Sequence, residues 1–229
     1  GKSWFQMTNG SYNKLPDDGG RCEVRFYDAN PNYIYVSIDR NGGELWRSSD
    51  CGGSWELRWD DVDYLSNQGW YDNVLWINPQ DYNDVVIGGI NLFRSLNGGS
   101  SFTRISDWTS YHNNSAANSA HADHHCIVEI GNFDQSTNPV VFFGNDGGIQ
   151  KASNVFSVSQ HSGWTNLANT SLGITQFYGG AAAPDGSIIV GGTQDNDKLR
   201  YKSSGTWSGP DNWFQSTTGD GGYSAINYN

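Results

Sequence analysis

A short polar motif that recurs about every fifty residues constrains this chain more than any other feature. Residues 48–55 read Ser-Ser-Asp-Cys-Gly-Gly-Ser-Trp, and residues 95–102 repeat this frame with Asn in place of Asp and Phe in place of Trp. The matching positions are Ser48, Asp50, Gly52 and Trp55 in one copy and Ser95, Asn97, Gly99 and Phe102 in the other. Asp and Asn accept backbone N–H groups across a tight turn, Gly supplies a positive φ, and the aromatic residue begins the next strand. The motif therefore predicts a structural turn between two strands.

The spacing of the aromatic residue predicts the architecture. The chain opens with the end of a third copy, Gly1 to Trp4, and two weaker copies place Trp164 and Trp213 at the matching point. The aromatic positions 4, 55, 102, 164 and 213 lie 51, 47, 62 and 49 residues apart. A period near fifty residues fits one four-stranded blade of a propeller. We therefore predict an all-β fold, a β-propeller of four-stranded antiparallel blades.

Four full blades are predicted along the chain, each with four short strands. Their ranges are 22–59, 74–105, 126–167 and 177–216. Residues 1–8 are predicted to hold the last strand of a preceding blade, and residues 223–229 the first strand of a following one. Four blades with two unpaired strands do not close a ring. We therefore expect residues 1–229 to be a fragment of a larger propeller.

The composition supports this class and argues against others. The 229 residues include 29 Gly, 10 Trp and 12 Tyr, and 24 acidic against 13 basic side chains give a formal charge of −11. A disordered chain of this acidity would lack so many aromatic residues. The deficit of positive charge argues against a nucleic-acid partner, and no apolar run is long enough to predict a membrane span.

The cysteines and the polar composition bear on the compartment. Cys22, Cys51 and Cys126 fit no zinc-binding spacing. A Cys22–Cys51 disulfide is possible in an oxidising compartment and would leave Cys126 over. Little Lys together with much Asn, Gly, Ser and Trp favours an exported protein, secreted or extracellular.

The repeated motif resembles the Asp-box, or BNR repeat, of sialidases, xyloglucanase-type glycoside hydrolases and sortilin-type receptors. A closer resemblance is to secreted bacterial BNR-repeat proteins that are often labelled glycosyl-hydrolase-like. Five motifs of that group occur in order, His-Ala-Asp-His-His at 121–125, Gly-Asn-Asp-Gly-Gly at 144–148, Gln-Phe-Tyr at 176–178, Gly-Thr-Gln-Asp-Asn at 192–196 and Gly-Asp-Gly-Gly at 219–222. The resemblance covers most of the chain and implies a propeller fold and, more loosely, an activity on carbohydrate.

Carboxyl groups are the first candidates for chemistry. The predicted strands place Asp123, Asp146, Asp195 and Asp220 in loops at one face of the propeller. Glycoside hydrolysis needs two carboxyl groups, one with a raised pKa. We single out Asp146 and Asp220 as catalytic candidates, with turn formation as the alternative role for each.

A metal site is a second interpretation of the same loops. His121, Asp123 and His125 alternate along the chain, so an extended strand would present them on one face to Ca²⁺ or Zn²⁺. The alternative is a structural hydrogen-bond network among these side chains.

Aromatic and amide side chains in the loops suggest a third role, because aromatic faces stack on sugar rings while polar groups bind hydroxyls. The candidate substrate-binding residues are Trp70, Tyr71, Trp108, Tyr111, Gln194, Asp195 and Asn196. For the strand residues Trp55, Trp164 and Trp213 we expect packing between sheets instead.

A sialidase is not favoured. Such an enzyme needs an arginine cluster for a carboxylate and a Tyr–Glu pair. Only Arg25 lies at a suitable strand position, and Glu129 is the only Glu in the second half of the chain.

Together these features predict an exported Asp-box propeller that engages a polysaccharide or another glycan, as a hydrolase or as a binding module. The alternative is a non-enzymatic structural or protein-docking propeller of an extracellular assembly, whose acidic face binds a protein partner or Ca²⁺.

Overall fold

The computed structural model describes residues 3, 14–112, 119–168, 174–205, 213–216 and 219–227. The chain divides into two compact units, residues 1–172 and residues 173–229, and each is described here by itself. The strand predicted within residues 1–8 lies outside the described residues, except for Ser3.

Unit 1 holds three four-stranded antiparallel sheets, each with its strands in chain order. The first sheet contains β1 (Cys22–Phe26), β2 (Ile34–Ile38), β3 (Glu44–Ser48) and β4 (Glu56–Trp59). The second contains β5 (Val74–Asn78), β6 (Asp81–Gly88), β7 (Leu92–Ser95) and β8 (Thr103–Arg104). The third contains β9 (His124–Glu129), β10 (Val141–Asn145), β11 (Gly148–Ala152) and β12 (Trp164–Asn166). The described part of the unit also includes the single-turn helix η1 (Ser66–Gln68) and the short helix α1 (Trp108–His112).

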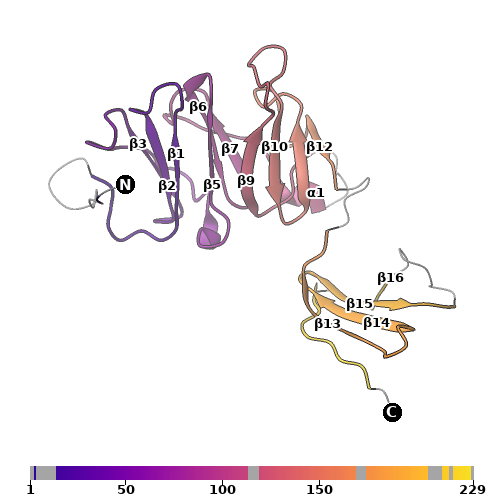
Figure 1. Ribbon diagram of the computed structural model, residues 1–229. Helices are drawn as coiled ribbons and strands as arrows, with labels where there is room; N and C mark the ends of the chain where they lie inside the picture. The colour runs from indigo at the N-terminus through magenta and orange to yellow at the C-terminus, as the bar shows by residue number, and fades with distance from the viewer. Residues whose placement is uncertain are drawn as a thin grey trace. The chain divides into compact units, whose positions relative to one another are not determined.

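The first strands of the three sheets lie next to one another. β5 packs against β1 on one side and against β9 on the other, as Figure 1 shows. Successive four-stranded sheets whose first strands share a common centre are the blades of a β-propeller. The protein is therefore all-β, and its sheets are those of a partial propeller.

The hydrophobic core lies between the blades. One cluster joins the second and third sheets and includes Trp76, Phe143 and Trp164, while another joins the first and second sheets. The Trp164 indole donates to the carbonyls of Ile105 (3.0 Å) and Ser159 (2.9 Å), so the indole hydrogen-bonds across the two sheets as well as packing between them. Trp55 and Trp164 are 7% and 5% exposed, in keeping with the packing role expected for them.

The first copy of the repeated motif forms a turn between β3 and β4. The Ser48 hydroxyl donates to the Asp50 carboxylate (2.8 Å) and accepts the backbone N–H of Gly52 (2.8 Å). Asp50 also accepts the backbone N–H and the hydroxyl of Ser54, at 2.8 and 2.7 Å. These hydrogen bonds hold the pKa of Asp50 below its usual range.

The second copy repeats these contacts between β7 and β8. The Ser95 hydroxyl donates to the Asn97 side chain (2.9 Å) and accepts the Gly99 N–H (2.9 Å), and Asn97 accepts the Ser101 N–H (3.0 Å). The turn predicted for both copies is therefore confirmed. The two turns differ at one position. Cys51 has a φ of +59° in the first turn, which is strained for a residue with a side chain, whereas Gly98 adopts +68° in the second turn without this cost.

The three cysteines are free in the structure, so the possible Cys22–Cys51 disulfide is not formed. Cys22 is in register with Ile38, at the end of β2, whereas the Cys51 N–H bonds the carbonyl of Asn32, just before β2 begins. The two thiols therefore lie at opposite ends of a strand.

Unit 2 holds a fourth sheet of the same kind, with β13 (Phe177–Ala182), β14 (Ile188–Thr193), β15 (Asn196–Lys202) and β16 (Trp213–Gln215). A two-residue strand, β17 (Gly219–Asp220), pairs in parallel with β15. The strand predicted over 223–229 is not formed by the described residues 223–227. A strand requires a hydrogen-bonding neighbour, and the described part of this unit offers none beyond its own sheet. Among the described residues, no helix has the length and apolar character needed to cross a membrane.

Candidate functional site

The two ends of the sheets in unit 1 carry different connections. Because the strands are antiparallel, the two repeated turns lie at one end, which we call the turn end. The opposite end, which we call the loop end, carries residues 39–43, 60–73, 89–91, 119–123 and 146–147. The candidate site residues of this unit that have described side chains lie at or beside the loop end.

The loop between β4 and β5 supplies one side of the site. The Gln68 carbonyl accepts the backbone N–H groups of Tyr71 (2.6 Å) and Asp72 (3.0 Å), which closes the loop into a compact turn. The Trp70 side chain is 70% exposed, and its ring lies 5.5 Å from the Tyr71 ring. This loop therefore offers an aromatic surface directly beside polar groups.

The segment that leads into β9 supplies the opposite side. Asp123 has a φ of +61°, and the strand begins only at His124. The extended segment predicted to align His121, Asp123 and His125 on one face is therefore wrong, because the backbone turns at Asp123. Among the residues that the structure describes, no three His, Cys, Asp or Glu side chains come together to hold a metal ion.

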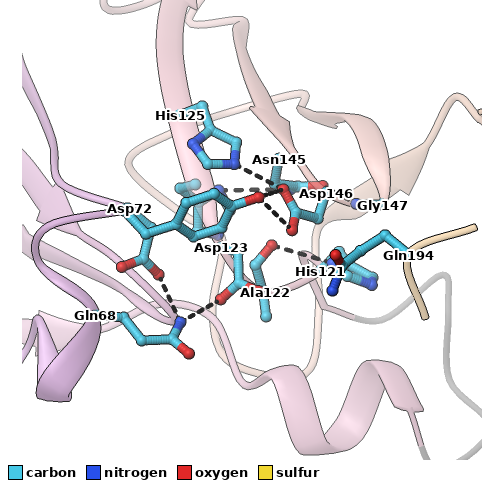
Figure 2. A network of polar contacts seen from close by, with 12 residues as sticks. Gln68, Asp72, His121, Ala122, Asp123, His125, Asn145, Asp146, Gly147 and Gln194 are labelled. Atoms are coloured by element: carbon cyan, nitrogen blue, oxygen red, sulfur yellow. Dashed lines mark hydrogen bonds and ion pairs between the residues drawn. The ribbon is translucent and has the colours of Figure 1, made fainter. Parts of the chain in front are cut away.

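A pair of carboxyl groups joins the two sides. The Gln68 amide donates to Asp123 (3.0 Å) and, at 3.4 Å, to Asp72, as Figure 2 shows. Asp72 is fully buried, and one of its oxygens, Oδ1, has no hydrogen-bond partner within the described structure. Burial first, and then the neighbouring Asp123 carboxyl, raise the pKa of Asp72 to about 8.

A third carboxyl group, that of Asp146, lies next to this pair. Asp146, in the turn between β10 and β11, accepts the Tyr71 hydroxyl at 3.0 and 3.1 Å and contacts His125 Nε2 at 2.7 Å (Figure 2). Burial and the Asp146 carboxylate raise the pKa of Tyr71 to about 12, so its hydroxyl keeps its proton and donates. The backbone N–H of Asp146 also bonds the carbonyl of Asp123 (3.3 Å). The two carboxyl sites thus share one framework.

His124 plays a structural part beneath these groups. Its ring is fully buried, and burial lowers its pKa to about 3, so the ring is neutral. Its Nδ1 faces the Asn145 amide at 3.4 Å, and Asn145 donates to Gln150. The backbone N–H of His124 bonds the Gly89 carbonyl (3.0 Å), which ties the third sheet to the second.

Gly147 explains one part of the Gly-Asn-Asp-Gly-Gly motif. A Cβ at this position would lie 2.4 Å from the His121 ring, closer than any side chain tolerates. Glycine therefore allows the segment before β9 to lie against the β10–β11 turn.

The remaining aromatic candidates are Trp108 and Tyr111. Trp108 opens α1, and its backbone N–H bonds the Asn91 side chain (3.0 Å). The Tyr111 side chain lies outside the described residues.

Unit 2 holds the other predicted residues. Asp220 accepts the backbone N–H of Asp195 (3.0 Å), and the Gln194 amide donates to the Asp195 carboxylate (3.3 Å). Asn196 opens β15 with an exposed side chain. Asp220 and Asp146 belong to different units, so their pairing stays a prediction.

Arg25 and Glu129, the two residues nearest to a sialidase pattern, make other contacts in the structure. The described hydrogen bond of Arg25 goes to the carbonyl of its neighbour Val24, and Glu129 accepts the Trp76 indole N–H (2.8 Å).

Sequence reasoning missed Gln68 and Asp72. The signal was present, because Asp72 precedes β5 much as Asp123 precedes β9. Equivalent positions in neighbouring blades lie close together around the centre of a propeller. The fifty-residue period would therefore have predicted that Asp72 lies near Asp123.

Comparison with known proteins adds the following. The chain matches no protein-family model, and no curated protein matches it. It is similar to the GH74 xyloglucanase from Xanthomonas campestris, with 14% identity over 86% of this chain and 31% of that one and a TM-score of 0.48. It is also similar to the Niastella koreensis GH74 enzyme, with 14% identity over 84% of this chain and 29% of that one and a TM-score of 0.44. YCF48 from Cyanidioschyzon merolae gives 15% identity, coverage of 89% and 59%, and a TM-score of 0.41. The chain thus spans less than a third of the two GH74 structures.

Proposed function

We propose that the loop end of unit 1 binds a glycan and hydrolyses a glycosidic bond. The observation that carries this proposal is the juxtaposition of the buried Asp72 and the partly exposed Asp123 with a separate Asp146 carboxylate. Glycoside hydrolysis uses one carboxyl that holds a proton and a second that does not. The exposed ring of Trp70 supplies the apolar surface on which a sugar ring stacks.

The roles follow from the exposure of each group. Asp123, which is partly exposed, donates a proton to the glycosidic oxygen as the bond between that oxygen and the anomeric carbon breaks. Asp146, held by Tyr71 and His125, accepts a proton from the water that attacks the anomeric carbon. One water is consumed: the anomeric carbon receives its hydroxyl group, and the glycosidic oxygen stays on the other sugar and gains a proton.

We also propose that the two repeated turns are Asp-boxes and that the protein is exported. The first proposal is supported by matching hydrogen bonds in the two turns, and the second by composition alone.

The test is turnover and binding across a panel of soluble polysaccharides and oligosaccharides, with release of reducing ends and calorimetry as readouts. The wild-type chain should release reducing ends from at least one glycan. Asp123→Asn should lower the rate about 100- to 10,000-fold, the range typical of losing a general acid. Asp185→Asn is the matched control, because Asp185 accepts hydrogen bonds only from Ser187 in an exposed turn of unit 2.

A folded chain that neither binds nor cleaves any member of the panel would contradict the proposal. The non-enzymatic docking propeller would then be the better hypothesis.

A further inference from the structure

The buried carboxyl of Asp72 has no direct route to a ligand. Its residue is 0% exposed, whereas Asp123 is partly exposed at the loop end. The same Gln68 nitrogen reaches an oxygen of each carboxyl, at 3.4 Å for Asp72 and 3.0 Å for Asp123. Asp72 can therefore act on a ligand only through Asp123.

We propose that Asp72 is a positioning residue that shares one proton with Asp123, so that Asp123 presents a carboxylic acid to the bound glycan. The inference rests on the proposed function and deepens it, because it assigns the origin of the proton. Asp72 itself touches no substrate.

Electrostatics supports the sharing of a single proton. Two carboxylates in contact within a buried site repel each other, and retaining one proton replaces the repulsion with a hydrogen bond. The Gln68 amide has two N–H groups, one for each carboxyl. Burial is the largest cause of the rise of the Asp72 pKa to about 8, and the neighbouring Asp123 carboxyl adds to it.

The other charged groups around Asp72 do not supply a counter-charge to its carboxyl. Arg21 donates to the carbonyls of Tyr71 and Asn73, on either side of Asp72, and forms an ion pair with Glu23 (3.0 Å). From the β9 side, the buried ring of His124 is neutral. Asp146 is the remaining carboxyl of the cluster, and its described hydrogen-bond partners are Tyr71 and His125.

The shared proton should be measurable as the titration of a carboxyl group. In the full chain with ¹³C-labelled aspartate, one carboxyl should titrate near pH 8, and Asp72→Asn should abolish this titration. Asp84→Asn is the matched control, because Asp84 is also buried with a raised pKa but bonds Asn78. Should Asp72→Asn fail to fold, Asp123→Asn removes the partner from a partly exposed position and should move the same titration to lower pH, because burial alone then raises the pKa of Asp72.

Turnover against pH gives the second readout. In Asp72→Asn the alkaline limb of the pH–turnover profile should move to lower pH. At pH values above the alkaline limbs of both proteins, the variant should turn over about tenfold more slowly than the wild type for each pH unit of this shift. A merely structural role would lower turnover equally at all pH values.

The outcomes separate the two proposals. If the titration near pH 8 is present but no glycan is cleaved, the shared proton stands and the proposed function fails. If no carboxyl titrates near pH 8, or if Asp72→Asn leaves this titration or the alkaline limb unchanged, the positioning role of Asp72 is overturned.

Discussion

The two ends of unit 1 are built from similar residues but satisfy them in different ways. At the turn end, Asp50 and Asn97 bond groups within four residues of themselves. At the loop end, Gln68 reaches Asp123 across 55 positions and Tyr71 reaches Asp146 across 75. The same chemical groups therefore serve local closure at one end and long-range assembly at the other.

This difference also appears in the pKa values of the carboxyl groups at the two ends. Local hydrogen bonds at the turn end lower the pKa of Asp50, which is the mark of a carboxylate that stabilises a turn. Burial and a second carboxyl at the loop end raise the pKa of Asp72 instead. A group with a raised pKa beside an exposed surface is a candidate for acid–base chemistry.

The largest expected effect comes from matched substitutions of aspartate at the two ends. Asp146→Ala should reduce glycan hydrolysis about 100- to 10,000-fold with little change in stability, because the carboxyl is proposed to act on water. Asp50→Ala should leave turnover per folded molecule unchanged and lower the midpoint of denaturation. Equal losses of turnover in both variants would erase the distinction between the ends.

The second-largest expected effect is a pH dependence of stability that arises from Asp72 at the loop end. The folded pKa of Asp72 is about 8, above its ordinary value of 3.8, so between these values the folded chain holds one more proton than the unfolded chain. The free energy of unfolding should therefore fall as pH rises through this window, by at most about 1.4 kcal/mol per unit for one proton. Denaturant titrations from pH 4 to 9 measure it, and Asp72→Asn should flatten the slope. A slope that Asp72→Asn leaves unchanged would assign it to another group.

The repeated turns should respond alike to loss of their serines. Ser48→Ala and Ser95→Ala each remove a buried hydroxyl that accepts the Gly52 or Gly99 N–H. Each should lower the free energy of unfolding by about 1–3 kcal/mol, measured by urea denaturation. A large loss in one turn and none in the other would show that the shared pattern does not have a shared energetic role.

The smallest effect is expected at the exposed aromatic surface. Trp70→Ala should weaken glycan binding by about 0.5–1.5 kcal/mol, because stacking contributes that much beyond simple burial. Leu96→Ala is the control, since Leu96 is 55% exposed beside the second turn at the opposite end. Calorimetry that finds the two variants equal would remove Trp70 from the binding surface.

The strands and turns of unit 1 could be predicted because their signals are local. β3 and β7 end at Ser48 and Ser95, the first residue of each copy of the repeated motif, because the turn that the motif forms fixes where the strand ends. The predicted alignment of His121, Asp123 and His125 is wrong because the backbone turns at Asp123. The sequence did not indicate this turn, since the positive φ accompanies a contact of Asp123 with the β10–β11 turn, far along the chain. The strand expected over residues 223–229 is not formed by the described residues 223–227 for a related reason. A β-strand needs a neighbouring strand with which to hydrogen-bond.

The sequence by itself determined the unit of construction. Its fifty-residue period and its Ser-x-Asp or Ser-x-Asn turns specify a four-stranded sheet through bonds between residues close in the chain. Only the tertiary structure decided which polar groups meet at the loop end. Asp72, Asp123 and Asp146 come from two successive blades, and their proximity depends on the packing of β5 against β9. Burial and charge repulsion, which raise the pKa of Asp72, arise only after that packing has formed.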